Sequence, residues 1–227
     1  MTIKVSVIGG TALVFDPSDC VILRKEHGIT GVLTGTLPSA PQQSLLLGVP
    51  LRLSVEEVLY LYEHKAVEFV SPLGPGTSLE SRNDSFFQTP DAAESAPMPD
   101  QELVLTKYVC GQKRDLDELY RTYCIFKTVK EKGHFTLPGL RFGGKFVSYP
   151  GDPLRYHSHF IINTKDFYSD RLDLVQLVKG GRLATGTKKM WLLAGEKGPG
   201  TRKKLALQVL NRETRTVCFS VEWAGFG

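Results

Sequence analysis

The spacing of apolar residues over the first 70 positions predicts a small unit of mixed strands and helices. Apolar and polar residues alternate over 3–8, as in a half-buried strand, and Asp16 followed by Pro17 is a typical helix start. Ser54 and Glu57 have the spacing of a capping box, which predicts a second helix start. The predicted elements are strands at Ile3–Ile8 and Ala12–Phe15, a helix from Pro17 to Glu26, a helix from Val55 to about His64, and a strand at Val67–Val70.

The second half of the chain opens with a helical stripe of apolar residues. They recur at helical spacing from Leu116 to Val129, and the helix is expected to end near Gly133. A later apolar segment is expected to form a helix that stops at Gly180 and Gly181, because glycine commonly follows the last helical turn. The remaining predicted elements are this helix through Leu172–Val178 and strands at Phe135–Leu137, Lys145–Tyr149, His159–Asn163, Met190–Ala194, Lys204–Leu210 and Thr216–Trp223.

Between these two units the composition changes. Five prolines, at positions 72, 75, 90, 97 and 99, stand among many Ser, Asp, Glu and Gly residues, which bury little apolar surface. We therefore predict an N-terminal domain over 1–70, a flexible linker over 71–100 and a second domain over 101–227. The predicted fold class is α/β (α+β), with a small mixed N-terminal domain and a mixed central sheet in the C-terminal domain.

Composition excludes some classes of protein and leaves others open. The chain has 227 residues, 41% of them hydrophobic and 23% charged, which is typical of a globular protein. No apolar run approaches the roughly 20 residues that span a bilayer, and the N-terminus lacks the pattern of a signal peptide. The four scattered cysteines have no CxxC spacing and are expected to be reduced and mostly buried. The net charge of +4 is compatible with a polyanionic partner but is weak evidence for one.

The segment GGKFVSYPGDPLRYHSH, over 143–159, is the most informative for chemistry. Gly151, Asp152 and Pro153 favour a turn, and two histidines follow it closely. Such a turn can bring the phenol of Tyr149 and the imidazole of His157 to the same edge of a sheet. A lysine opens the strand that follows the next predicted helix.

A phenol, an imidazole and an ammonium group together can cleave RNA without a metal ion. The 2′-hydroxyl must lose a proton to attack the adjacent phosphorus, the 5′-oxygen must gain one, and the phosphorane between them carries extra negative charge. Tyr149, His157 and Lys189 suit these three tasks in that order. We therefore predict neither a metal nor another cofactor, and products that end in a 2′,3′-cyclic phosphate and a 5′-hydroxyl.

Two segments, YPGDPLRYHSHFI and GGRLATGTKKMWLL, resemble the catalytic core of the tRNA-splicing endonucleases, in which Tyr, His and Lys follow one another at comparable spacing. The resemblance implies an endonuclease that cuts precursor tRNA at an intron boundary, with Tyr149, His157 and Lys189 as its catalytic residues. Lys188 leaves the last assignment open by one position. The segment GVLTGTLPSAPQQSLLLGVPLRLSVEEVLYLYEHKAVEFV resembles the N-terminal part of the eukaryotic subunit that cuts the 3′ splice site.

The same resemblance implies partners and an RNA contact. It predicts a heterotetramer with a small structural subunit, a second catalytic subunit and its structural companion, in which the strand Thr216–Trp223 adds to a partner's sheet. Arg182 and Trp223 match positions where related subunits hold a substrate base between an Arg and an aromatic ring, in the service of the cut made by the other catalytic subunit. We expect a nuclear protein, with the cytoplasm or an organelle surface as the alternative.

Other interpretations stay open at this point. A non-catalytic structural subunit of the same assembly would bind tRNA or partners without chemistry, although the intact Tyr, His and Lys set argues against it. A general RNA-binding module would show paired aromatic strand motifs, which the sequence lacks. Arg182 as a helix cap and Trp223 as the buried end of the last strand are the structural alternatives. His27 and His64 are expected to mark helix ends, and His159 shares a strand face with His157 if the segment is extended.

Overall fold

The computed structural model describes residues 2–35, 48–70, 100–197 and 215–224. Residues 71–99 of the predicted linker and the predicted strand Lys204–Leu210 lie outside the described residues. The fold is α+β, as the sequence predicts, with a five-stranded mixed sheet in each half of the chain.

The N-terminal sheet has the strand order β3-β4-β2-β1-β5. Strand β1 pairs in parallel with β5 and antiparallel with β2, and the other pairs are antiparallel. Two of its strands, β3 and β4, were not predicted, because one is only four residues long and the other contains a proline. The elements are β1 Ile3–Ile8, β2 Thr11–Val14, α1 Pro17–Glu26, β3 Val32–Gly35, β4 Gly48–Leu53, α2 Val55–Glu63 and β5 Val67–Phe69.

Both predicted helix starts are confirmed by side-chain caps. The Asp16 carboxylate accepts a hydrogen bond from the Ser18 backbone N–H at 2.8 Å, at the start of α1. At the start of α2, Ser54 Oγ accepts from the Glu57 N–H at 3.2 Å while the Glu57 carboxylate accepts from the Ser54 N–H at 2.8 Å. This is the reciprocal capping box that the sequence predicts, and it satisfies donors that the first helical turn leaves free.

A helix that was not predicted, α3 over Gln101–Cys110, precedes the long helix α4 over Leu116–Glu131. Helix α3 packs against β5 of the N-terminal sheet. The Gln101 side chain accepts from the Phe69 N–H at 2.6 Å and donates to the Phe69 carbonyl at 3.1 Å. The Gln101 side-chain amide thus satisfies both backbone groups of Phe69 at the edge of the sheet. The N-terminal sheet is therefore bonded to a residue of the second half of the chain.

The C-terminal sheet has the order β10-β9-β8-β7-β6. Neighbouring strands are antiparallel except β8 and β9, which run in parallel because helix α5 carries the chain back between them. The elements are β6 Phe135–Pro138, a short 3₁₀ turn η1 Leu140–Phe142, β7 Phe146–Tyr149, β8 Phe160–Asp166, α5 Leu174–Gly186, β9 Met190–Glu196 and β10 Thr216–Val221.

The predicted end of α5 at Gly180 and Gly181 is wrong, because the helix continues to Gly186. Both glycines are buried, and a Cβ built on Gly180 would lie 2.4 Å from Cε2 of Trp191. Gly180 lets the helix approach the Trp191 ring closely, so it serves packing inside the helix rather than its termination.

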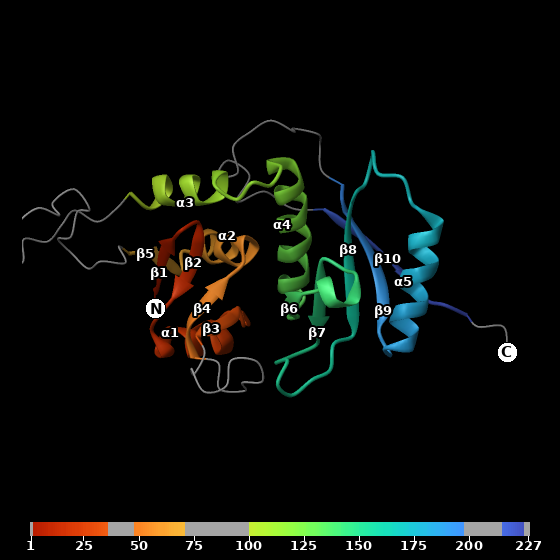
Figure 1. Cartoon of the computed structure of the whole chain (residues 1–227), viewed down its shortest axis with the longest axis horizontal. Coiled ribbons are helices and arrows are strands. Elements are labelled where there is room, and N and C mark those ends of the chain that lie inside the picture. The colour runs from red at the N-terminus through yellow and green to blue at the C-terminus, as the bar shows by residue number, and fades with distance from the viewer. Residues whose placement is uncertain (1, 36–47, 71–99, 198–214, 225–227) are drawn as a thin grey trace, which may run out of the picture.

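Helix α4 lies between the two sheets, and α5 covers the outer face of the C-terminal sheet (Figure 1). The buried residues on both sides of α4 form one continuous cluster that runs from β1 to β9. Phe126 on α4 illustrates the join: its ring centroid lies 6.1 Å from that of Tyr60 on α2 and 5.8 Å from that of Phe146 on β7. The two halves of the chain therefore share one core.

The cysteines are free, but the expectation that most are buried is wrong. Only Cys124 on α4 is buried, whereas Cys110 ends α3 and Cys218 lies on the exposed strand β10. Helix ends and edge strands leave side chains in solvent that their apolar character alone would place inside. Within the described ranges, no helix is long and apolar enough to cross a membrane.

We expect Gly180→Ala to lower the free energy of unfolding of the full chain by about 1–3 kcal/mol, because the new methyl group must displace the Trp191 ring. Urea denaturation followed by circular dichroism measures this. Gly186→Ala is the matched control on the same helix, since its added Cβ would have no atom within 4 Å. An equal loss of stability in both variants would contradict the packing role of Gly180.

Candidate active site

Tyr149 is the last residue of β7, and it pairs with Phe135 at the edge of the sheet. Its side chain is half-buried. The strand ends there because Pro150 follows, which lacks the N–H that a further ladder bond requires. Tyr149 thus marks the point at which the chain leaves the sheet and enters the loop 150–159.

The loop 150–159 is organised around Asp152. The Asp152 carbonyl accepts from the N–H groups of Arg155 at 2.8 Å and Tyr156 at 3.0 Å, and its carboxylate accepts from the Leu154 N–H at 2.8 Å. This is an aspartate-stabilised turn of the kind that the motif predicts. The exposed His157 comes directly after the turn.

From Ser158 onward the loop rejoins the sheet. Ser158 is buried, whereas His157 and His159 on either side of it are exposed, so the two histidines share one face of an extended segment. The His159 N–H donates to the Ser148 carbonyl at 2.9 Å, and the His159 carbonyl accepts from the Met190 N–H at 2.8 Å. These bonds tie the segment to β7 on one side and to β9 on the other.

Lys189 lies in the turn between α5 and β9. Its N–H donates to the Ala184 carbonyl at 2.8 Å, and its ammonium group donates to the Thr187 carbonyl at 3.0 Å. The same ammonium nitrogen lies 4.8 Å from the ring centroid of Phe142. Lys188, by contrast, is exposed and has a φ of 54°, the left-handed conformation that a tight turn requires.

The strand register brings the predicted residues to one edge and one face of the sheet. Val147, Ile161 and Trp191 are cross-strand partners on the face that α5 covers. The row formed by Tyr149, His159 and Lys189 follows the paired row Ser148, Phe160 and Met190. It lies two residues from the apolar row and therefore on the same face. His157 lies two residues further along.

In the described part of the chain, no hydrogen bond or ion pair joins Tyr149, His157 and Lys189 to one another. The phenol, the imidazole and the ammonium group therefore lie at one edge without bonding to one another, and the ammonium group is held by the Thr187 carbonyl. Each of the three residues comes from the end of a different strand. Their spacing in the sequence suggests that they are neighbours, and the strand pairing brings them to one edge.

His134 is a neighbour of this edge that the sequence analysis did not select. Its Nδ1 lies 2.8 Å from Ser148 Oγ, and burial lowers its pKa, with the charges of His159 and Lys132 acting in the same direction. It therefore favours the neutral form, in which one ring nitrogen can accept the Ser148 hydroxyl proton. His27 and His64 occupy the C-caps of α1 and α2, as predicted.

Arg182 and Trp223 lie against each other, 5.5 Å from the guanidinium carbon to the ring centroid. Neither structural alternative fits this arrangement. Arg182 is an exposed residue inside α5, which runs four residues further, and Trp223 follows β10 with 39% of its surface exposed. The pair is a preformed cation–π contact open to solvent, and a base entering between the two groups would have to separate them.

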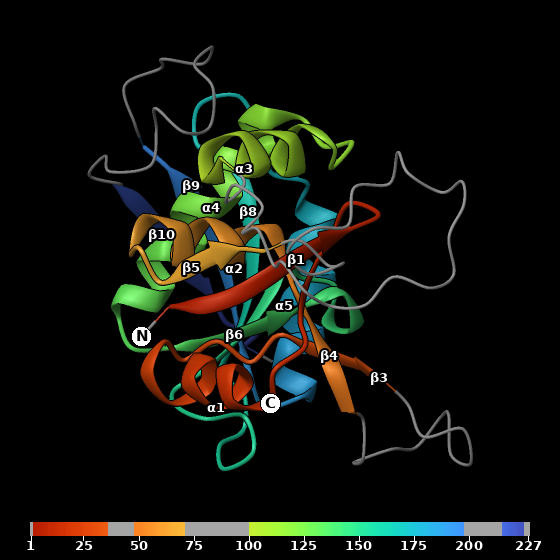
Figure 2. The same ribbon diagram turned by 90° about the vertical axis from the view of Figure 1, so that its left-hand side faces the viewer.

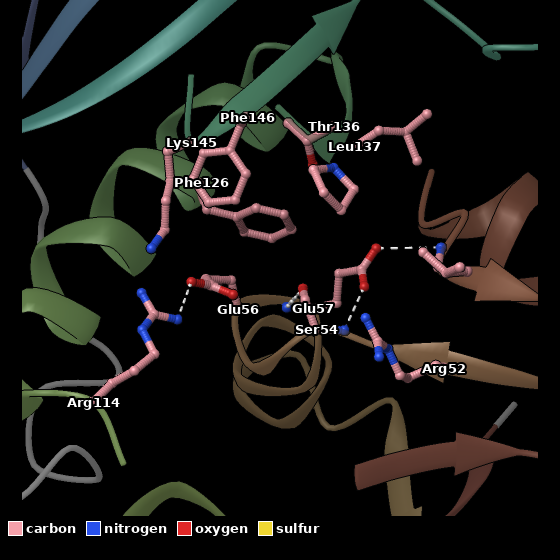
Figure 3. A pocket seen from close by; sticks show the side chains of 13 residues that line it. Arg52, Ser54, Glu56, Glu57, Arg114, Phe126, Thr136, Leu137, Lys145 and Phe146 are labelled. Atoms are coloured by element: carbon pink, nitrogen blue, oxygen red, sulfur yellow. Dashed lines mark hydrogen bonds and ion pairs between the residues drawn. The ribbon is translucent and has the colours of Figure 1, made fainter. Parts of the chain in front are cut away.

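A hollow of about 200 Å³ lies elsewhere, between the two halves of the chain (Figure 3). Its two carboxylates already have partners: Glu56 pairs with Arg114 at 2.9 Å, and Glu57 accepts from the Gly31 N–H at 3.3 Å. Burial raises the pKa of Glu57. The lining residue Phe146 belongs to the face of β7 that packs on α4, so this hollow is part of the domain interface and not of the edge that carries Tyr149.

Among the described residues, no group of three His, Cys, Asp or Glu side chains is arranged to hold a metal ion.

Two protein families match consecutive parts of the chain. Residues 3–72 match the family described as TSEN34-like, N-terminal domain, and residues 119–211 match the family described as tRNA intron endonuclease, catalytic C-terminal domain. The second match contains Tyr149, His157, Arg182 and Lys189, whereas Trp223 lies beyond it.

Three relatives align with most of this chain and with nearly all of their own length. The tRNA-splicing endonuclease subunit SEN34 of Saccharomyces cerevisiae is 31% identical, with 95% of this chain and 99% of that protein covered. The probable tRNA-splicing endonuclease subunit sen34 of Schizosaccharomyces pombe is 29% identical, with 98% of each chain covered. The tRNA-splicing endonuclease subunit Sen34 of Homo sapiens is 25% identical, with 90% of this chain and 97% of that protein covered.

Proposed function

Because the chain belongs to the SEN34 family of tRNA-splicing endonuclease subunits, we propose that it is a catalytic subunit that cuts precursor tRNA at one intron boundary, the 3′ splice site. One observation carries this proposal: Tyr149, His157 and Lys189 come from three strand ends that meet at one edge of the sheet, inside the segment that matches the catalytic domain. The alternative, a non-catalytic subunit of the same assembly, has no need of this set.

The proposed reaction is a transesterification within the RNA. Tyr149, reacting as its phenolate, takes the proton of the 2′-hydroxyl, whose oxygen attacks the adjacent phosphorus. The bond to the 5′-oxygen breaks as His157 gives that oxygen a proton, which leaves a 2′,3′-cyclic phosphate and a 5′-hydroxyl. Lys189 stabilises the negative charge of the phosphorane, so that no metal ion is required.

The environments of His157 and Lys189 support their roles. His157 lies in an exposed loop, where a phosphodiester can reach it. Within the described residues Lys189 forms no ion pair, and its charge is held only by a carbonyl and by the Phe142 ring. A positive charge that no carboxylate neutralises is available to a phosphate.

The partners are proposed on similar grounds. Among the described residues, strand β10 forms one edge of the C-terminal sheet, and Phe219 on it is 60% exposed. An open edge with an exposed ring suits strand addition by another subunit. We propose a heterotetramer with a small structural subunit, a second catalytic subunit and its structural companion, located in the nucleus.

The Arg182 and Trp223 pair is proposed to hold an unpaired tRNA base and so to serve the cut made by the second catalytic subunit.

The first test is cleavage of a labelled intron-containing tRNA by the reconstituted complex, with the cut ends mapped. We expect cleavage to continue in excess EDTA, and His157→Ala to slow the cut at the 3′ splice site by about 10²- to 10⁴-fold while the other cut proceeds normally. Loss of chemistry in EDTA that a divalent ion restores, with the tRNA fold held constant, would refute the metal-free mechanism. Unchanged cleavage by His157→Ala would remove that residue from it.

A second test distinguishes Lys189 from Lys188. Adjacent side chains at a strand start point in different directions, and the row of Tyr149 and His159 contains Lys189. We therefore expect Lys189→Met to reduce the single-turnover rate at saturating enzyme far more than Lys188→Met. The two variants remove the same charge, so each is the control for the other. A larger loss with Lys188→Met would reverse the assignment.

The third test concerns the Arg182 and Trp223 pair. Arg182→Ala and Trp223→Ala should each weaken one of the two cuts by the equivalent of about 1–3 kcal/mol, the typical contribution of one stacked base. Size-exclusion chromatography must show that the complex remains assembled. If both variants assemble normally and cut both sites at the parental rate, the pair is structural.

A further inference from the structure

The loop that carries His157 is held from outside its own domain. Arg24 on α1 donates to both carboxylate oxygens of Asp152, from Nε at 2.8 Å and from Nη2 at 2.5 Å. The two residues are 128 positions apart in the sequence. Two perpendicular views show the loop, drawn in teal, next to α1 (Figure 1, Figure 2).

The contact reaches the residue on which the loop turns. Asp152 also accepts the N–H groups of Leu154, Arg155 and Tyr156, so its position determines the direction in which the chain continues to His157. The two-pronged guanidinium fixes the orientation of the carboxylate as well as its distance. It also lowers the pKa of Asp152 to about 2, which keeps this carboxylate ionised throughout the neutral range.

The turn over 151–156 has few other anchors, since the hydrogen bonds that tie the loop to β7 and β9 are made by His159. Leu154 is 79% exposed and Tyr156 is 53% exposed, so the turn gains little from apolar burial. Other contacts across the domain interface come from buried groups on α4: Tyr123 and Lys127 bond to Glu63 of α2, and Lys130 donates to the Gly28 carbonyl at 2.6 Å. These hold the two halves together, but none of them contacts the loop.

The solvent exposure of the Arg24–Asp152 ion pair indicates whether it acts on stability or on geometry. About a third of each partner's side chain is exposed, at 33% for Arg24 and 29% for Asp152. Ion pairs this accessible contribute little to global stability. A two-pronged contact across domains, on a turn without apolar anchors, therefore has its main effect on the geometry of the turn and of the residues that follow.

We propose that Arg24 is a positioning residue of the N-terminal domain, which sets the place of His157 in the active site through Asp152. This inference rests on the proposed role of His157 in cleavage. It makes the N-terminal domain part of the catalytic apparatus of its own chain, in addition to any part that it has in assembly.

The test is Arg24→Met in the reconstituted complex, under single-turnover conditions with saturating enzyme. We expect the rate of the cut that depends on His157 to fall by about 10- to 100-fold, as displacement of a reacting group by about 1 Å typically causes. The affinity for precursor tRNA, the rate of the other cut and the melting temperature should not change. Lys25→Met is the matched control, because it removes the same charge from an exposed neighbour on the same helix. It should behave like the parent.

Coupling through Asp152 is tested by a double-mutant cycle. Asp152→Asn keeps a side-chain oxygen for the Leu154 N–H but loses the charged partner of Arg24. The double variant should be no slower than the slower single variant, since both changes break one contact. Arg24→Lys, which retains the charge but not the two-pronged geometry, should recover only part of the rate.

The outcomes separate this inference from the proposed function. If His157→Ala slows the cut while Arg24→Met equals the parent, Arg24 has no positioning role and the proposed function stands. If Arg24→Met slows both cuts equally, or lowers the melting temperature along with the rate, its role is general stabilisation and the inference is wrong. If His157→Ala leaves the cut unchanged, His157 is not part of the mechanism, and the inference about its positioning is wrong for that reason.

Discussion

Helix α4 has to bury two faces at once, and most of the architecture follows from this requirement. Its apolar residues contact α2 on one side and the C-terminal sheet on the other, with Phe126 between rings from both. A helix that is apolar over so much of its circumference cannot lie on a surface, so it is stable only between two layers. For the same reason the polar side chains of Tyr123, Lys127 and Lys130 on α4 make contacts across the interface.

The buried amine of Lys130 shows the electrostatic cost of this arrangement. It lies between the rings of Tyr60 and Phe135, 5.9 and 5.2 Å from their centroids, and donates to the Gly28 carbonyl. Burial lowers the pKa of Lys130 to about 8. The folded chain therefore releases this proton at lower pH than the unfolded chain, so Lys130 makes stability rise with pH above about 8 and contributes its full penalty below that value.

Local signals in the sequence predicted local structure well. The capping box at Ser54 and the turn at Asp152 are both formed as predicted, because their partners lie within four positions. The predicted end of α5 was wrong because glycine is common both at helix ends and where a helix packs closely on its neighbours. Gly180 and Gly181 lie inside the helix, next to Trp191 and Val221. Long-range structure was beyond reach. The row that contains Tyr149, His159 and Lys189 depends on strand order, and the Arg24 contact with Asp152 links positions that no local pattern connects.

Strand β10 has a consequence for the chain before it meets any partner. The sequence TVCFSV has no charge, no proline and a high content of residues that favour strands, and one of its edges is unpaired in the described structure. Such a segment is a template for any other exposed strand, including the same strand of a second copy. If another subunit covers this edge, as proposed, an excess of this chain over that partner is expected to aggregate.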